Sequence, residues 1–276
     1  MNAHTKEVLE GKRFEFGKNW AKFLSSLNEE RIVEAEKSLK NMLRINDLQG
    51  KSFLDIGSGS GLFSLAARRL GAKVFSFDYD PKSVACTQAL KERFFPNDVD
   101  WKIEEGNVLD KDYLKSLGQF DVVYSWGVLH HTGDMWSALD NVSALVKDNG
   151  MLFIAIYNKQ PLLSKYWMIV KKTYNKTPKL FKLLMEVFYI AYFIAILFVA
   201  DVLRGRNPFS RYSGRGRRGM SVFYDIIDWI GGYPFEVASP EEIFNFYHQK
   251  RFNLINLKTC AGKHGCNEYV FKKKLV

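Results

Sequence analysis

Short apolar runs and helical patterns alternate along residues 51–157, and no other feature constrains the fold as strongly. Runs typical of buried strands are expected at Ser52–Ile56, Lys73–Phe77, Trp101–Ile103, Phe120–Ser125 and Met151–Tyr157. Helices are expected between them at Leu62–Leu70, Pro81–Phe94 and Met135–Val146, the last ended by Asn149-Gly150. Strands joined through helices run parallel, so the pattern predicts an α/β fold with a doubly wound, mostly parallel sheet.

The last part of the chain departs from this alternation. A helix is expected at Glu241–Gln249, followed by strands at Phe252–Leu257 and Tyr269–Phe271. The glycine-containing loop between these two strands is too short for a helical crossover, so they should pair antiparallel. The sheet should therefore have seven strands and end in an antiparallel C-terminal hairpin.

Four regions follow from these patterns. Residues 1–50 form an N-terminal helical cap, 51–157 the main part of the sheet, and 239–276 the last helix and closing hairpin. Residues 158–238 are an expected helical insertion after the fifth strand, with 16 aromatic residues. This insertion has 13 Lys or Arg against 5 Asp or Glu, nearly all of the chain's net charge of +10, which favours an anionic partner.

Composition and cysteine content limit the class of protein. The apolar content is typical of a globular protein, and three cysteines without framework spacing argue against a disulfide-stapled secreted fold. Residues 1–11 lack the apolar stretch of a signal peptide, so a cytoplasmic location is expected. Cys260, His264 and Cys266 fit no standard zinc spacing, and we expect an ordinary loop and no metal site.

A glycine-rich loop follows the first strand and opens a helix. Its sequence is Asp55-Ile56-Gly57-Ser58-Gly59-Ser60-Gly61. Glycines at this position let the backbone approach a ligand closely, although the spacing differs from the G-x-G-x-x-G of dinucleotide-binding proteins. Asp78 ends the second strand, 21 residues after Gly57. A carboxylate there can accept hydrogen bonds from both ribose hydroxyls.

Four segments in order resemble the class I S-adenosylmethionine-dependent methyltransferases, and among them the ubiquinone-biosynthesis O-methyltransferase type. They are the glycine loop, Phe77-Asp78-Tyr79-Asp80, Glu105-Gly106-Asn107-Val108 and Phe120-Asp121-Val122-Val123-Tyr124-Ser125. The resemblance covers residues 50–157 through these motifs and 239–273 through topology, and it does not cover the insertion. It implies a reversed final hairpin, as the spacing also predicts.

The resemblance also implies S-adenosylmethionine as the cofactor and assigns the residues that bind it. Gly57, Ser58, Gly59 and Gly61 would line its methionine and ribose portion, with Asp55 preceding the loop. Asp78 would hold the ribose with Tyr79 beside it, Asn107 and Val108 would frame the adenine, and Ser125 and Trp126 would lie near the sulfonium. Asn107 stands where an aspartate is frequent, which removes charge from the adenine contact. Phe16 and Trp20, in an amphipathic N-terminal segment, are expected to close over the cofactor.

Two histidines are candidates for a general base. His131 follows the fourth strand at the carboxyl edge of the sheet, where such sheets bind ligands, and it aligns with a histidine of the family's L-x-H segment. His264 follows the sixth strand, which should be parallel to the others, so its loop should reach the same edge. Each also has a structural alternative: His131 could cap the next helix or pack in its loop, and His264 could be a surface turn residue.

The insertion is expected to choose the acceptor. Its apolar run, Val187–Ala200, has 14 residues and is shorter than the ~20 of a membrane span, which favours a buried or interfacial helix. Basic clusters on both sides suit a lid over a lipid-like, anionic acceptor, or peripheral contact with the inner membrane surface. A homodimer contact is the alternative. Tyr157, Arg215, Arg217 and Arg218 are the candidate substrate-binding residues.

Methyl transfer to a small-molecule or lipid-like acceptor, with oxygen favoured, is the function predicted. The arginine-rich segment leaves a nucleic-acid (tRNA) methyltransferase as an alternative, although no recognised RNA-binding domain accompanies it. A non-catalytic cofactor-binding module is a further alternative. A nicotinamide cofactor is disfavoured by the glycine spacing and the antiparallel hairpin.

Overall fold

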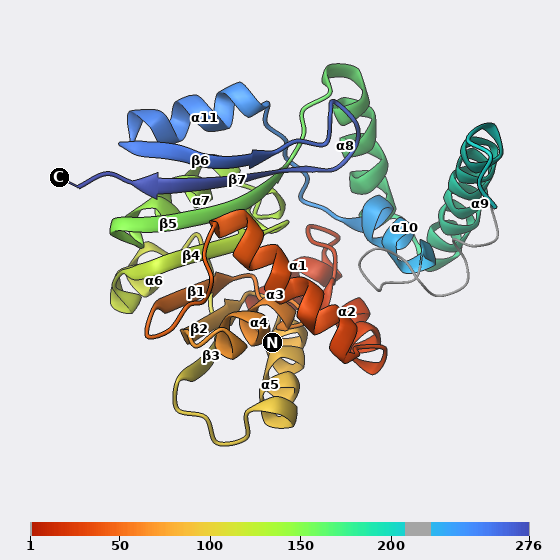
Figure 1. Ribbon diagram of the computed structural model, residues 1–276. Helices are drawn as coiled ribbons and strands as arrows, with labels where there is room; N and C mark the ends of the chain where they lie inside the picture. The colour runs from red at the N-terminus through yellow and green to blue at the C-terminus, as the bar shows by residue number, and fades with distance from the viewer. Residues whose placement is uncertain (1, 208–221, 276) are drawn as a thin grey trace.

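The computed structural model describes residues 2–207 and 222–275, and a mixed seven-stranded sheet forms its centre (Figure 1). The strand order is β3-β2-β1-β4-β5-β7-β6. The first five strands pair in parallel, and β7 runs antiparallel to both β5 and β6, as the sequence predicts. The strands are β1 Ser52–Ile56, β2 Lys73–Asp78, β3 Trp101–Glu105, β4 Phe120–Trp126, β5 Val146–Tyr157, β6 Phe252–Lys258 and β7 Cys266–Lys273.

Helices cover both faces of the sheet and bury two apolar clusters. One cluster joins the sheet to α3 (Glu29–Leu43), α4 (Leu62–Arg69) and α5 (Pro81–Phe94). The other joins it to α7 (Met135–Ala144) and α11 (Pro240–Gln249). Burial of the apolar faces of both layers makes the fold a doubly wound α/β sandwich, which confirms the fold class.

The boundary between α7 and β5 differs from the prediction. We expected a helix as far as Val146, ended by Asn149-Gly150. Instead α7 ends at Ala144, and Val146 already pairs with Phe120 at the start of β5. The register of the β4–β5 pair shifts between Phe120 and Val122, and Asn149 has a φ of 61°. Asn149-Gly150 therefore lies in an irregular segment of the strand. Asn149 has the left-handed conformation there, which asparagine tolerates better than most residues.

A short helix and a 3-10 turn were not predicted. Helix α6 (Lys111–Leu117) is capped by Asp110, whose carboxylate accepts from the amides of Asp112 and Tyr113, and it buries only Leu114. The 3-10 turn η1 covers Leu129–His131. Neither segment is long enough for a helical period to be recognised in the sequence.

The N-terminal helices α1 (Ala3–Leu9) and α2 (Gly17–Ser25) lie across the carboxyl ends of the strands (Figure 1). Phe14 N donates to the Tyr233 carbonyl oxygen at 2.8 Å, which joins the segment between them to the chain that returns from the insertion. The cap therefore contacts both the sheet edge and the insertion.

The insertion comprises α8 (Pro161–Lys176), α9 (Lys179–Leu203) and α10 (Val222–Gly231). Its own apolar cluster includes Trp167 on α8, Tyr189 on α9 and Ile230 on α10. At Val187–Ala200 the sequence favours a buried or an interfacial helix, and the buried alternative is wrong. The helix is 25 residues long, because its apolar pattern continues on both sides of that run, and among its residues only Tyr189 and Asp201 are buried.

Candidate functional site

The glycine loop turns sharply between β1 and α4. Gly57, Gly59 and Gly61 have φ values of 76°, 55° and 78°, a left-handed conformation that favours glycine. A Cβ at Gly57 would lie 2.5 Å from the side chain of Val128, and one at Gly59 would lie 3.0 Å from the ring of Trp20. The loop therefore needs glycine for its shape and for the close approach of its neighbours.

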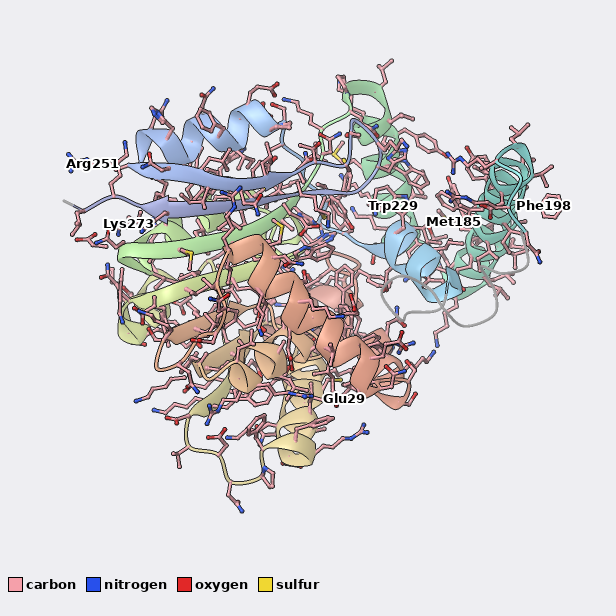
Figure 2. The ribbon with its side chains drawn as sticks, viewed as in Figure 1. Glu29, Met185, Phe198, Trp229, Arg251 and Lys273 are labelled. Atoms are coloured by element: carbon pink, nitrogen blue, oxygen red, sulfur yellow. The ribbon has the colours of Figure 1, made fainter. Side chains whose placement is uncertain are left out.

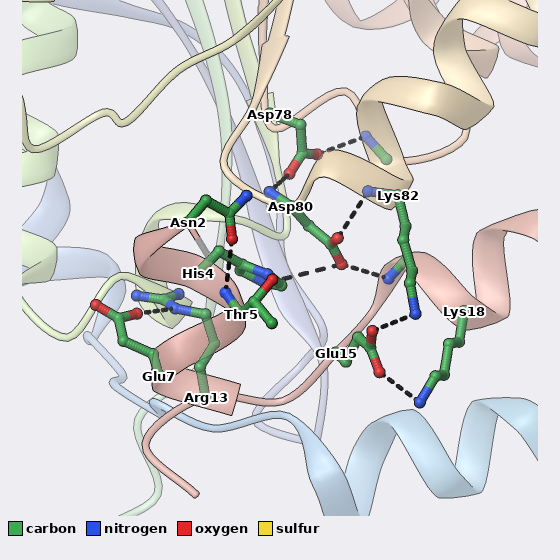
Figure 3. Close-up of polar contacts among 12 residues, drawn as sticks. Asn2, His4, Thr5, Glu7, Arg13, Glu15, Lys18, Asp78, Asp80 and Lys82 are labelled. Carbon is green, nitrogen blue, oxygen red and sulfur yellow. Dashed lines mark hydrogen bonds and ion pairs between the residues drawn. The ribbon is translucent and has the colours of Figure 1, made fainter. Parts of the chain in front are cut away.

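Asp78 lies beside this loop at the end of β2 (Figure 3). Its carboxylate accepts hydrogen bonds from the amides of Gly59 and Asp80, each at 2.9 Å. Burial raises the pKa of Asp78 to about 6. Each oxygen of a carboxylate can accept more than one hydrogen bond, so Asp78 has the capacity to accept from ribose hydroxyls as well.

Asp55 and Ser58 connect the loop to the helices that pack beside it. Asp55 is buried, and the hydroxyl of Ser64 donates to its carboxylate. Burial raises the pKa of Asp55 to about 7. The hydroxyl of Ser58 is 2.9 Å from that of Thr87 on α5. Both side chains fix the loop's conformation through contacts with α4 and α5.

The predicted adenine residues, Asn107 and Val108, follow β3. The Asn107 side-chain oxygen accepts the Leu109 amide at 2.9 Å, so it already closes a local turn. Val108 is buried, and its carbonyl oxygen accepts from the side chain of Asn141. Gly106 N donates to the Asp78 carbonyl oxygen at 3.0 Å, so this turn lies beside the end of β2, and its role toward the adenine stays a prediction.

The predicted sulfonium residues, Ser125 and Trp126, end β4. The Ser125 hydroxyl donates to the Ile56 carbonyl oxygen at 3.0 Å and is fully buried. Trp126 packs against the apolar cluster on the α3–α5 face. Ser125 therefore holds the ends of β1 and β4 together, and its role toward the cofactor stays a prediction.

Phe16 and Trp20 lie one helical turn apart at the start of α2 and contact two different parts of the site. The ring of Phe16 is 5.0 Å from that of His131, and Trp20 covers Gly59. Residues four apart share one face of a helix, so this single turn spans the distance from the glycine loop to the candidate base.

The N-terminal helical cap contacts the segment after β2 through Asp80 (Figure 3). The Asp80 carboxylate accepts from the amide of Gly17 at 2.8 Å and lies 3.8 Å from the imidazole of His4. Tyr79 contacts α1, since its hydroxyl donates to Glu7 at 3.3 Å and the Arg13 guanidinium lies over its ring. These contacts place Tyr79 between the cap and the strand end.

Replacing Trp20 with alanine should weaken cofactor binding about tenfold, because a large aromatic surface would no longer cover the loop. Calorimetric titration with S-adenosylhomocysteine measures this effect. Trp136→Ala is the matched control, since Trp136 lies on α7 against Phe246 and away from the loop. Equal affinities in the two variants would show that the cap does not cover the cofactor.

His131 is buried at the carboxyl edge, and its tautomer is defined by its neighbour. Its Nδ1 is 2.6 Å from the Pro234 carbonyl oxygen. A carbonyl only accepts, so Nδ1 carries the proton and Nε2 is left with a lone pair. Burial lowers the pKa of His131 to about 3, which keeps the ring neutral at physiological pH. His131 is therefore a neutral imidazole held in one tautomer, and its role as a general base stays a prediction.

Aromatic side chains from the insertion surround Tyr157, the predicted substrate residue at the end of β5. The ring of Tyr157 is 3.9 Å from His130, 5.4 Å from Trp229 and 5.5 Å from Phe235. His130 is fully buried, and its Nε2 has no hydrogen-bond partner among residues 2–207 and 222–275. His130, Tyr157, Trp229 and Phe235 form an aromatic wall beside His131.

A buried lysine next to this wall could not be recognised from the sequence. The Lys171 ammonium donates to the Trp229 carbonyl oxygen and lies 4.3 Å from the centre of the Trp229 ring. Burial lowers the pKa of Lys171 to about 7. In the sequence it was one of six lysines in a basic stretch, and no signal separates it from the exposed ones.

His264 lies at the same edge of the sheet as His131, but it contacts different residues. Its ring lies 5.5 Å from Trp229 and 6.1 Å from Trp167, whereas His131 contacts Phe16 and Tyr157. The other predicted substrate residues, Arg215, Arg217 and Arg218, lie outside the described residues. Their role stays a prediction.

The strand order, the glycine loop and the acidic end of β2 together define a class I S-adenosylmethionine-dependent methyltransferase. A family model described as a methyltransferase domain matches residues 27–183, and the chain belongs to this family. The residues present fit the cofactor, because the Asp78 carboxylate lies beside the glycine loop and can accept further hydrogen bonds; its contact with the ribose stays a prediction.

The chain is also similar to curated O-methyltransferases. The ubiquinone biosynthesis O-methyltransferase of Pelagibacter ubique is 34% identical over 131 residues, which cover 47% of this chain and 48% of that protein. The enzyme of the same description from Escherichia fergusonii is 33% identical over 118 residues, 42% of this chain and 47% of that protein. The chain thus spans about half the length of the curated relatives it matches.

Solved structures share the fold at low sequence identity. Magnesium protoporphyrin IX methyltransferase from Synechocystis PCC 6803, with bound SAH, has a TM-score of 0.51 and 13% identity, covering 99% of this chain and 89% of that one. A protein that converts a disulfide bond into a thioacetal group during echinomycin biosynthesis has a TM-score of 0.52 and 12% identity, covering 99% and 93%. Both likenesses support the methyltransferase fold.

Proposed function

We propose that this chain transfers the methyl group of S-adenosylmethionine to an oxygen atom of a small, lipid-like acceptor, at the cytoplasmic surface of the inner membrane. The observation that carries this proposal is the placement of His131. Phe16 and Trp20 join the neutral, oriented imidazole to the glycine loop across one turn of α2. The curated relatives named as ubiquinone biosynthesis O-methyltransferases support oxygen as the acceptor atom.

His131 would remove the acceptor's proton. When bound, the cofactor supplies a methyl group on a positively charged sulfur, so the sulfur–carbon bond breaks as the carbon–oxygen bond forms. Nε2 of His131 accepts the hydroxyl proton. The imidazole gains a positive charge as the sulfur loses one, so the net charge of the buried site stays constant. The burial that lowers the pKa of the free histidine therefore opposes this step less.

The aromatic wall and Lys171 indicate the acceptor's chemistry. Tyr157, Trp229 and Phe235 provide flat apolar surfaces that suit a ring or an isoprenoid-like chain. A buried lysine favours its charged form when an anion lies nearby, as Asp228 does, so Lys171 also suits the phenolate oxygen that forms as His131 takes the acceptor's proton. An apolar ring with an acidic oxygen satisfies both requirements.

Methyl-labelled S-adenosylmethionine tests the proposal. The chain should transfer label to a phenol that has an isoprenoid tail, with kcat/KM about tenfold or more above that for the same phenol without the tail. The product should be an alkali-stable methyl ether. Label found in bulk tRNA instead of the phenol, or cofactor binding without turnover of any tailed phenol, would contradict it.

A further inference from the structure

Helix α9 leaves most of its apolar surface uncovered. Within residues 2–207 and 222–275 it is the one helix long and apolar enough to cross a membrane. Figure 1 shows it at the edge of the molecule, away from the sheet. Exposed fractions are 62% for Phe188, 60% for Val187 and 81% for Leu203. Exposed apolar surface of this extent in a protein marks an interaction site.

One stripe of α9 faces the body of the protein. Met185, Tyr189 and Phe193, spaced four residues apart, pack against the cluster of the insertion. Figure 2 labels Met185 and Phe198, which lie on different turns of this helix. After Phe193 the helix continues for ten residues, about 15 Å, and its apolar side chains in this part include the exposed Phe198.

The exposed apolar residues are not limited to a second stripe. Neighbours in the sequence are exposed together, which places them about 100° apart around the axis: Leu180 with Phe181, Leu183 with Leu184, Val187 with Phe188, Phe198 with Val199, and Val202 with Leu203. A second helix would cover one stripe, whereas a fluid apolar medium covers all of these positions. Lipid is therefore the occupant that fits this surface.

Basic residues lie at both ends of α9. Lys172, Lys176 and Lys179 are exposed before or at its start, and Arg204 and Arg206 are exposed after its end. Anionic headgroups attract such clusters. Positive charge at both ends lets both ends lie at the headgroups of one leaflet.

The sheet excludes a single crossing. Strand β5 precedes α9, β7 follows it, and the two pair along Met151–Tyr157 and Cys266–Lys272, so both lie on one side of any membrane. One crossing by α9 would need a second crossing before β7. Helices α8 and α10 pack in the cluster of the insertion, and neither is long and apolar enough to span, so the described residues provide no second crossing.

We propose that α9 lies in the plane of an anionic bilayer and does not cross it. Its exposed apolar residues enter the leaflet that faces the protein. This placement would let a lipid-like acceptor pass from the bilayer toward Tyr157. This inference rests on the proposed membrane contact and does not depend on methyl transfer. Lipid binding and cofactor binding are therefore measured in separate experiments.

Vesicle flotation of the full chain tests the binding. The chain should float with vesicles of phosphatidylcholine and phosphatidylglycerol and partition at least about tenfold less to phosphatidylcholine alone at low salt. Phe188→Glu should lower partitioning about tenfold. Val99→Glu should not, because Val99 is 83% exposed in the loop before β3. All three proteins should bind S-adenosylhomocysteine equally, so a failed cofactor assignment would be seen separately.

Spin labels test the orientation. Labels at positions 180, 181, 183, 184, 187, 188, 198, 199, 202 and 203, in a background with Cys260 and Cys266 replaced by serine, should show immersion depths that vary with the helical period and are similar for the same face of the helix at both ends. A steady change in depth from one end to the other would show a crossing and overturn the proposal. No flotation, or a dimer in solution that Phe188→Glu dissociates, would overturn it as well.

Discussion

Replacing His131 with alanine is expected to lower kcat for methyl transfer by about 10²–10⁴-fold. The loss follows from removal of Nε2, the atom that the Pro234 carbonyl leaves free to accept a proton. Cofactor affinity should change by less than about threefold, because His131 acts on the acceptor's side of the site. Initial rates with the tailed phenol and calorimetry with S-adenosylhomocysteine measure the two quantities.

His264→Ala is the control for this experiment. His264 contacts Trp167 and Trp229 but neither Phe16 nor Tyr157, which His131 contacts, so its loss should change kcat by less than about tenfold. His131→Gln should be as inactive as His131→Ala, since an amide cannot act as a base. Equal losses in the His131 and His264 variants, or full activity of His131→Gln, would remove His131 from the mechanism.

Replacing Asp78 with alanine should weaken S-adenosylhomocysteine binding by about 10- to 150-fold, the equivalent of ~1.5–3 kcal/mol for hydrogen bonds to a charged group. The variant also removes the acceptor of the Gly59 amide, so the loop loses a contact that shapes it. Asp112→Ala, at an exposed carboxylate on α6, should bind as the native chain does. An unchanged dissociation constant for Asp78→Ala would refute the ribose assignment.

The same carboxylate should make cofactor affinity depend on pH. Burial raises the pKa of Asp78 to about 6, and the ionised form is the one that accepts hydrogen bonds from ribose. Affinity should therefore be constant above about pH 7 and fall as pH decreases through 6. Asp78→Asn does not titrate and should bind weakly at every pH, so a matching decrease in that variant would point to another group.

The meeting of the glycine loop and Asp78 could be predicted from the sequence, because each lies in a local pattern. The glycine loop and Asp78 each lie directly after a strand, and strand ends are set by short-range patterns. Parallel topology then brings Gly59 and Asp78 to the same edge, where they make a hydrogen bond.

The acceptor side could not be predicted, because it depends on contacts distant in sequence. Lys171 is buried only because α10 returns to place Trp229 beside it, and Pro234 orients His131 from 103 residues away. The exposure of α9 likewise depends on which residues the rest of the fold covers. An apolar run has the same periodicity in a protein core and in lipid.

Calorimetric titration of the native chain with S-adenosylmethionine and S-adenosylhomocysteine tests the central claim most directly. The account predicts one site per chain and micromolar dissociation constants for both, each equivalent to about −8 kcal/mol. It also predicts that nicotinamide dinucleotides do not compete. Absence of saturable binding by either adenosyl compound, or tighter binding of a nicotinamide dinucleotide, would contradict the assignment of this chain as an S-adenosylmethionine-dependent methyltransferase.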